Sequence, residues 1–126
     1  MKDLIQKALK ARENSYSPYS QFAVGAALEA EDGTIYTGCN VENASYGLSV
    51  CAERTALVKA VSEGAKKFKR LAIVADTEKP VTPCGMCRQM LMEFSPEMKL
   101  ILGNTQGKSE TITLTELLPK AFKLNR

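Results

Sequence analysis

The segment Leu71-Ala72-Ile73-Val74-Ala75 is the feature that most restricts how this chain can fold. A strand with one face in water alternates apolar and polar residues, whereas a continuous apolar run is typical of a strand covered on both faces. Segments with helical spacing lie on either side of it in the sequence, at 52–63 and 84–94. We therefore predict a three-layer α/β/α domain, in which a central sheet lies between helices.

The remaining elements are predicted from local patterns. Helical spacing at 4–12, with Asp3 as the N-cap, predicts a helix that ends before Ser17-Pro18, because a residue that precedes proline avoids helical backbone angles. Asp32-Gly33 is typical of a hairpin turn, and the polar segment 40–50 predicts a loop. The predicted elements are, in order, a helix at 4–12, strands at 22–28 and 34–37, a helix at 52–63, a strand at 71–75, a helix at 84–94, strands at 98–102 and 110–113, and a short helix at 114–118.

Length and composition favour one ordinary globular domain. The chain has 126 residues, of which 44% are hydrophobic and 25% charged, so we predict a single domain over 1–126. The 17 basic and 14 acidic residues leave a net charge of +3 spread along the chain, which argues against a nucleic-acid partner. No apolar run approaches the roughly 20 residues that span a bilayer, and no secretory signal is visible. We expect a cytoplasmic protein with no membrane partner.

The four cysteines, together with the absence of histidine, indicate what chemistry the chain can perform. Without histidine, no imidazole can act as a general base or a metal ligand. The cysteines are Cys39, Cys51, Cys84 and Cys87. Disulfides are disfavoured in a reducing compartment, where a cysteine cluster is more often metal-binding or catalytic.

Three of these cysteines fall at the starts of predicted helices. Cys84 and Cys87 lie one turn apart at one helix start, and Cys51 lies at the start of the preceding helix. The N–H groups and the positive dipole end of a helix N-terminus favour thiolate over thiol. Three protein ligands with a fourth position left for water are typical of a catalytic zinc site. Glu53, two residues after Cys51, can lie beside the metal as a proton shuttle.

Two other interpretations of the cysteines stay open. Cys84-Gly85-Met86-Cys87 is also the spacing of redox sites, although such a site needs neither Cys51 nor Glu53. A closed structural zinc site with Cys39 as the fourth ligand is the second alternative. Cys39 ends a predicted strand, where a small buried cysteine is the commoner role, so the pattern favours an open catalytic zinc without Cys39.

The motifs around these residues resemble one family. Cys51-Ala52-Glu53-Arg54 and Pro83-Cys84-Gly85-Met86-Cys87-Arg88-Gln89 are similar to the zinc-deaminase signature of the small homotetrameric cytidine deaminases, with cysteine in place of histidine in the first half. The resemblance covers nearly the whole chain. Its other blocks are Ser17-Pro18-Tyr19-Ser20, Phe22-Ala23-Val24-Gly25-Ala26-Ala27-Leu28, Gly38-Cys39-Asn40-Val41-Glu42-Asn43-Ala44-Ser45-Tyr46 and Leu117-Leu118-Pro119.

The resemblance implies a fold and an activity. The fold is a mixed sheet of about five strands with helices on both faces. The activity is zinc-dependent hydrolysis of cytidine and deoxycytidine to uridine and deoxyuridine plus ammonia, in pyrimidine salvage, with one zinc per subunit on Cys51, Cys84 and Cys87. Glu53 carries protons from water to the ring nitrogen and to the departing amine. The active assembly is a homotetramer whose sites are shared between subunits.

The resemblance also implies roles for residues around the zinc. Phe22 packs against the pyrimidine ring, and Asn40 and Glu42 bind a ribose hydroxyl that both sugars possess. The Ala52 amide and the Glu53 carboxylate contact the polar edge of the base. Two aromatic residues, Tyr46 and Phe122, reach towards a neighbouring subunit's site. Charge, and not the resemblance, points to Arg54: three thiolates on Zn²⁺ carry a net −1 charge, and Arg54, one turn from Cys51, is the candidate to offset it by hydrogen bonding to the sulfurs, the alternative being a solvated helix arginine.

Three rival functions share part of this pattern. A blasticidin-type aminonucleoside deaminase shares the cysteine motifs but lacks the blocks around Phe22 and Asn40. A polynucleotide-editing deaminase needs a positive groove with stacking aromatic residues, which the mild charge and absent tryptophan argue against. A non-catalytic, zinc-stabilised binding module keeps the cysteines but has no need of Glu53.

Overall fold

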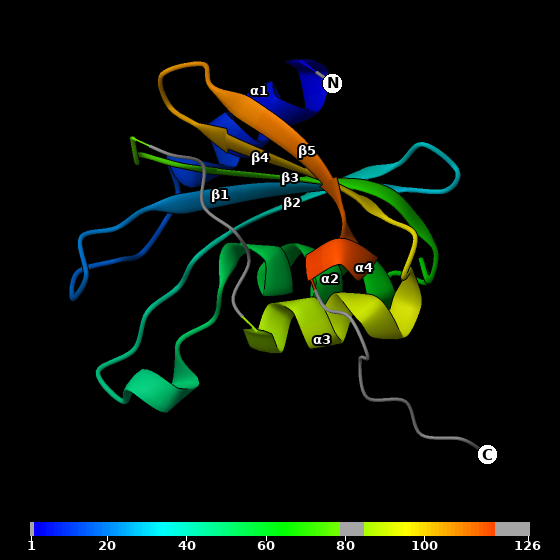
Figure 1. Cartoon of the computed structure of the whole chain (residues 1–126). Coiled ribbons are helices and arrows are strands. Elements are labelled where there is room, and N and C mark those ends of the chain that lie inside the picture. Colours follow the sequence, from blue (N-terminus) through cyan, green and yellow to red (C-terminus); the bar gives the residue numbers. More distant parts are fainter. Residues whose placement is uncertain (1, 79–84, 118–126) are drawn as a thin grey trace.

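The computed structural model describes residues 2–78 and 85–117 (Figure 1). No helix within these ranges is long and apolar enough to cross a bilayer. The elements are, in chain order, α1 (Lys2–Arg12), β1 (Val24–Ala30), β2 (Ile35–Cys39), the 3₁₀ helix η1 (Tyr46–Leu48), α2 (Ala52–Ser62), β3 (Phe68–Ala75), α3 (Gly85–Phe94), β4 (Lys99–Asn104), β5 (Ser109–Thr113) and α4 (Leu114–Leu117).

The five strands form one mixed sheet in the order β2-β1-β3-β4-β5. β1 pairs antiparallel with β2 and β3, β3 pairs parallel with β4, and β4 pairs antiparallel with β5. The apolar run 71–75 lies at the centre of the sheet and is fully buried. The prediction that this strand is covered on both faces is confirmed, and so is the predicted mixed sheet.

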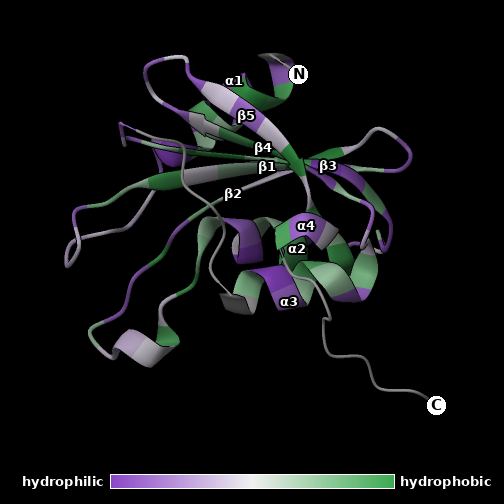
Figure 2. Ribbon diagram, in the orientation of Figure 1, coloured by the Kyte–Doolittle hydropathy of each residue, from purple (hydrophilic) through white to green (hydrophobic). Residues whose placement is uncertain are grey.

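Helices cover the two faces of the sheet unequally (Figure 1). Of the helices that the structure describes, only α1 packs on one face, where Leu4 and Ala8 belong to the smaller core cluster. α2, α3 and α4 lie on the other face and bury the larger cluster, which includes Leu57, Leu91 and Leu114. Figure 2 shows hydrophobic residues running through the inner strands between these two helical layers. The predicted three-layer arrangement is therefore confirmed.

Several details differ from the sequence prediction: β3, for example, begins at Phe68 and not at Leu71, and β2 extends to Cys39 and not to Thr37. α1 begins at Lys2, so Asp3 lies in the first turn of the helix, and its assignment as N-cap is wrong. β1 begins at Val24 and not at Phe22. The reason is that the Asn40 side chain replaces a neighbouring strand at this point: its Oδ1 accepts a hydrogen bond from Val24 N (2.9 Å) and its Nδ2 donates one to Phe22 O (2.7 Å).

Gly25 is required where α1 crosses β1. A Cβ atom at this position would lie 1.9 Å from the Ala8 carbonyl oxygen and 2.7 Å from the Arg12 backbone nitrogen. Both are helix backbone atoms, which cannot move without shifting α1 as a whole. The absence of a side chain at Gly25 therefore allows the helix to lie close to the sheet.

We expect Gly25→Ala to lower the free energy of unfolding by about 3 kcal/mol, the upper end of the usual cost of overpacking. The measurement is the denaturant midpoint of the zinc-loaded protein. The matched control is Gly103→Ala, because Gly103 also lies in a strand but a Cβ there would approach no atom closer than 3.5 Å. A Gly25→Ala protein as stable as the Gly103→Ala protein would contradict the close packing of α1.

Candidate metal and catalytic site

The start of α2 is held firmly against the sheet. Cys51 is its N-cap, with extended backbone angles, and the Cys51 carbonyl accepts hydrogen bonds from N and Oγ1 of Thr55 (3.0 and 3.1 Å). Gly38 of β2 lies directly below: a Cβ there would be 2.6 Å from Ala56 N and 2.7 Å from Ala52 O. Close packing on β2 thus determines where the first turn of α2 presents its side chains.

The first turn of α3 carries the second cysteine of the site. Cys87 is only 1% exposed. Arg88, the next residue, donates a hydrogen bond from Nη1 to the carbonyl of Leu117 in α4 (3.0 Å), which fixes α3 to its neighbour. Cys84, which is predicted to be the third zinc ligand, lies outside the described residues.

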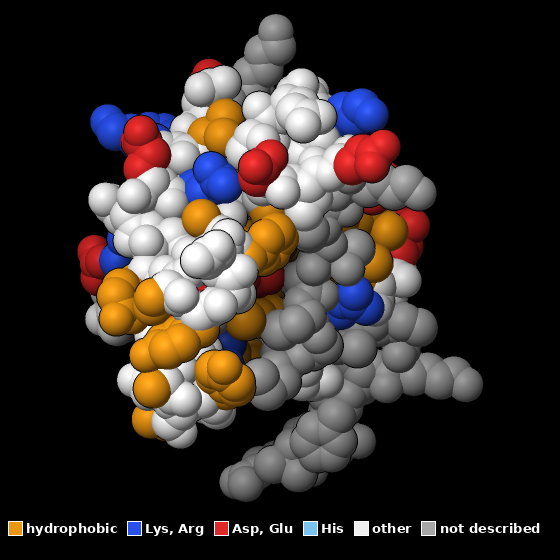
Figure 3. Space-filling view, turned by 90° about the vertical axis from the view of Figure 1, so that its left-hand side faces the viewer, with side chains coloured by type: hydrophobic (Ala, Val, Ile, Leu, Met, Phe, Trp, Pro, Cys, Tyr) orange, Lys and Arg blue, Asp and Glu red, His pale blue; other side chains and the backbone are white. Residues whose placement is uncertain are grey.

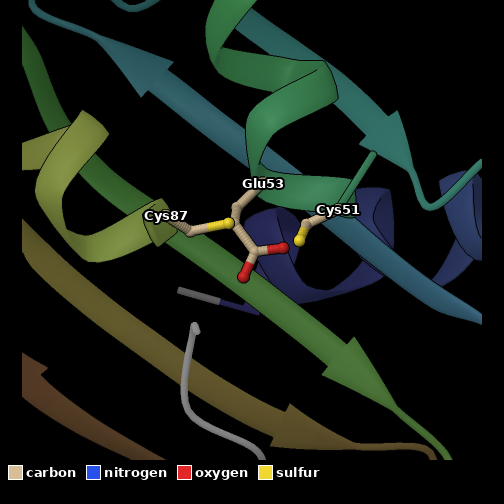
Figure 4. Close-up of side chains that lie close together, drawn as sticks. All are labelled: Cys51, Glu53 and Cys87. Carbon is tan, nitrogen blue, oxygen red and sulfur yellow. The ribbon is translucent and has the colours of Figure 1, made fainter. Parts of the chain in front are cut away.

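Side chains from these two helix starts meet in one cluster. The Cys51 sulfur, a Glu53 carboxylate oxygen and the Cys87 sulfur all lie within 4.8 Å of one another. Figure 4 shows Cys87 and Cys51 directed towards the Glu53 carboxylate from the two helices. Glu53 is 6% exposed, so the carboxyl group is largely withdrawn from water. The convergence expected for Cys51 and Cys87 is present among the described residues.

Burial raises the pKa of the Glu53 carboxyl to about 7. A hydrogen bond from its own backbone N–H lowers the pKa, the Cys51 charge raises it, and the positive charge of Arg54 lowers it slightly. Desolvation outweighs the opposing effects because a buried carboxylate loses its hydration. A carboxyl with this pKa can both accept and donate a proton near neutral pH.

The donor set fits zinc. Thiolates are soft ligands that suit zinc, whereas magnesium and calcium take oxygen donors. The positive ends of α2 and α3 favour the thiolate form of both cysteines. Cys39, half-buried at the end of β2, is not part of this cluster among the residues that the structure describes.

Asn40 is positioned by hydrogen bonds within the chain. Its Oδ1 accepts from Val24 N and from the Ser15 hydroxyl, and its Nδ2 donates to Phe22 O. An amide nitrogen has two hydrogens, and only one of them has an acceptor among the described residues, so the other can be offered to a ligand. Phe22 itself is 38% exposed and lies outside β1, so it does not take the core position that an aromatic residue in an apolar strand ordinarily occupies.

Glu42 lines a cavity beside the loop 17–22. The cavity has a volume of about 370 Å³, and its lining residues are Tyr19, Ser20, Glu42, Tyr46 and Ser49. The rings of Tyr19 and Tyr46 meet edge to face, with centroids 6.2 Å apart. A larger depression of about 620 Å³ runs along α1, on the opposite face of the sheet from the Cys51–Glu53–Cys87 cluster.

Two residues of this region have roles that sequence reasoning missed. The Ser15 hydroxyl donates to Asn40 Oδ1, and the Ser20 hydroxyl donates to Glu42 Oε2. Ser20 belongs to the block that starts at Ser17, which the family resemblance already marked as characteristic. That block was the only signal for Ser20, and no motif marked Ser15, because both hydrogen bonds join residues more than 20 positions apart.

Hydrophobic side chains gather on one face of the molecule. Figure 3 shows them over the lower part of the face on which the loops 13–23 and 40–50 project. Tyr46 is 76% exposed and Leu48 67% exposed. The other large exposed hydrophobic residues of these loops are Tyr16, Tyr19, Phe22 and Val41. Contiguous exposed hydrophobic surface of this kind marks interaction sites.

Comparisons with known proteins point to one group of enzymes. The family model of the cytidine and deoxycytidylate deaminase zinc-binding region matches residues 1–103. A cytidine deaminase of Sporosarcina psychrophila is 58% identical over 120 residues, which cover 94% of this chain and 88% of the relative. One of Halalkalibacterium halodurans is 57% identical, with 94% and 91% covered. The crystal structure of cytidine deaminase from Burkholderia pseudomallei matches with a TM-score of 0.93 and 48% identity, over 96% of this chain and 98% of that chain.

Proposed function

This chain belongs to the family of cytidine and deoxycytidylate deaminases, and we propose that it hydrolyses cytidine and deoxycytidine to uridine and deoxyuridine plus ammonia. The observation that carries the proposal is the cluster of Cys51, Glu53 and Cys87, in which two thiol groups flank a buried carboxyl. A non-catalytic zinc module has no use for such a carboxyl. In a cell, the reaction would return pyrimidine nucleosides to salvage, in the reducing cytoplasm where thiols persist.

One zinc ion per chain is proposed, with Cys51, Cys84 and Cys87 as ligands. When bound, zinc lowers the pKa of a water molecule so that hydroxide is available near neutrality. Arg54 is proposed to donate hydrogen bonds to the sulfurs, since the net −1 charge of three thiolates and Zn²⁺ needs an offset. Its charge already acts at this site, because it lowers the pKa of Glu53.

Glu53 is proposed to move every proton of the reaction. Its carboxylate accepts a proton from the attacking water and delivers it to N3 of the cytosine ring, while the oxygen adds to C4. Glu53 then takes the second proton from the hydroxyl group now on C4 and transfers it to the exocyclic amino group; the C4–N bond breaks as the C4 carbonyl forms, and ammonia leaves. A pKa of about 7 suits both directions of transfer, because the carboxyl must change its protonation state within each turnover.

The surrounding residues are proposed to hold the nucleoside. Phe22 packs on the base, and its partial exposure outside β1 supports this role. The Ala52 amide and the Glu53 carboxylate contact the polar edge of the base. Asn40 and Glu42 bind the 3′ hydroxyl of the sugar, and Glu42 lines a cavity of about 370 Å³ beside it.

The active assembly is proposed to be a homotetramer whose sites are shared. The exposed hydrophobic residues of the loops 13–23 and 40–50 support this, because burial against a second copy removes them from water. Tyr46 is the described residue proposed to reach a neighbouring site. Phe122, the other candidate, lies outside the described residues.

We expect a native mass of four chains. Mixing inactive Glu53→Gln subunits with Phe122→Trp subunits, once the latter are shown to be inactive, should restore activity under conditions that allow exchange. Some mixed sites then combine an intact Glu53 with an intact Phe122. Mixed tetramers without activity would contradict shared sites, and a monomeric active enzyme would contradict the tetramer itself.

The function is tested by measuring ammonia released from cytidine, deoxycytidine, cytosine and blasticidin S by the zinc-loaded protein. Turnover of the two pyrimidine nucleosides is the expected result. Turnover of blasticidin S alone would identify an aminonucleoside deaminase instead, and no turnover of any substrate would support a zinc-stabilised binding module.

A further inference from the structure

The hydroxyl of Ser20 connects the two halves of the proposed nucleoside site. It donates a hydrogen bond to Glu42 Oε2 and accepts one from the backbone N–H of Phe22 (3.1 Å). A serine hydroxyl has one hydrogen and two acceptor lone pairs, so it can make both bonds at once. One side-chain atom therefore links the residue proposed to face the base with the residue proposed to bind the sugar.

The Glu42 carboxylate is oriented through both of its oxygens. Oε1 accepts from the backbone N–H groups of Tyr19 (3.0 Å) and Ser20 (3.1 Å), while Oε2 accepts from the Ser20 hydroxyl. Within the described residues, no lysine or arginine forms a salt bridge with Glu42. These hydrogen bonds lower the pKa of Glu42, and the bond from the Ser20 side chain has the largest effect. The carboxylate is held ionised by neutral donors, and its remaining lone pairs can accept from a sugar hydroxyl.

The backbone between Ser20 and Phe22 is strained. Gln21 has a φ of 57°, a left-handed conformation that residues other than glycine adopt at a cost. Two hydrogen bonds hold this turn: Gln21 N donates to Ser17 O (2.9 Å), and Phe22 N donates to the Ser20 hydroxyl. The second bond spans the strained residue and joins the Ser20 side chain to the backbone of Phe22.

We propose that Ser20 is a positioning residue that orients Glu42 relative to Phe22 and thereby selects pyrimidine nucleosides that carry a 3′ hydroxyl. In this role Ser20 acts through its hydrogen bonds to Glu42 and Phe22. The inference rests on the proposed function, because it assigns Ser20 to the sugar side of that same site.

The test compares Ser20→Ala with Ser20→Thr on two substrates, cytidine and 2′,3′-dideoxycytidine. For Ser20→Ala we expect KM for cytidine to rise about tenfold, as for the loss of one hydrogen bond to a charged group, with kcat within about threefold of wild type. On dideoxycytidine, which has no hydroxyl for Glu42, the rise in KM should be threefold or less. Ser20→Thr keeps the hydroxyl on an exposed residue, so its KM should stay within about twofold of wild type.

A double variant separates positioning from general damage to the loop. If Ser20 acts through Glu42, Ser20→Ala should change KM less than about twofold in a Glu42→Ala background, which removes the acceptor of the Ser20 hydroxyl. The matched control is Ser45→Ala, an exposed serine of the other loop whose side chain does not cap the adjacent helix η1. It should leave KM within about twofold of wild type.

Two outcomes would overturn the proposal. One is an equal rise in KM on both substrates, and the other is a Ser20→Ala enzyme with wild-type kinetics. Wild-type deamination of cytidine is measured in the same assay: its absence from zinc-loaded protein overturns the proposed function as well, whereas normal wild-type activity confines the failure to Ser20.

Discussion

Glu53→Gln is expected to keep the fold and the zinc but to lose at least about 10⁴-fold in kcat. Glutamine has nearly the same shape as glutamate, so the buried position can hold it, but its amide cannot accept and return a proton at neutral pH. General acid–base groups commonly contribute about 10²–10⁴-fold to the rate. Because Glu53 is proposed to serve several proton transfers in one turnover, its contribution should lie at or beyond the upper end of this range.

The measurement is ammonia release by zinc-loaded enzyme, with zinc content and melting temperature determined on the same samples. Glu63→Gln is the matched control, because Glu63 is an exposed glutamate at the opposite end of the same helix, as the C-cap of α2. It should retain activity within about twofold. A zinc-loaded Glu53→Gln protein with substantial turnover would eliminate Glu53 as the proton carrier.

Cys87→Ser is expected to lower the zinc content from one per chain to near zero and to reduce activity at least about 10³-fold. Cys87 is buried in the first turn of α3, where its thiolate can ligate zinc, whereas a serine hydroxyl stays protonated at neutral pH. Substitution of a residue that only hydrogen bonds to a metal ligand typically lowers metal affinity about 10–100-fold, so the loss of a ligand itself should lower it further.

Metal analysis after dialysis measures this effect, with circular dichroism to show that the variant remains folded. Cys39→Ser is the matched control, because Cys39 is the cysteine of the described residues that lies outside the cluster. It should keep one zinc and full activity. Loss of zinc from the Cys39→Ser protein would replace the open site by a closed one with four cysteine ligands.

Most of the helices and strands could be predicted because their signals are local. Apolar spacing in 4–12 and 52–63, and the continuous apolar run 71–75, depend only on neighbouring residues. α1 and α2 match their predictions within two residues at each end, and β3 contains the whole apolar run but begins three residues earlier. Element boundaries were less accurate where tertiary contacts act. The start of β1 moved to Val24 because the side chain of Asn40, 16 residues later, takes the place of a strand partner.

Part of the candidate site could also be predicted from position alone. Cys51 is the N-cap of α2 and Cys87 lies in the first turn of α3, and helices that flank one buried strand bring such N-terminal ends together. The default role of Glu42 in a polar loop is that of a solvent residue. The structure instead gives its carboxylate three hydrogen bonds from the loop 17–22, which no sequence pattern within either loop encodes.

By itself, the sequence determined which segments become helix or strand, which strand is buried on both faces, and which residue types are available for chemistry. Only the tertiary structure decided the strand order β2-β1-β3-β4-β5, the meeting of Cys51, Glu53 and Cys87, and the pKa of about 7 for Glu53. The physical reason is how far apart in the chain the interacting residues lie. Secondary structure follows from interactions between neighbours in the chain, whereas desolvation and side-chain hydrogen bonds depend on atoms that folding brings together from distant segments.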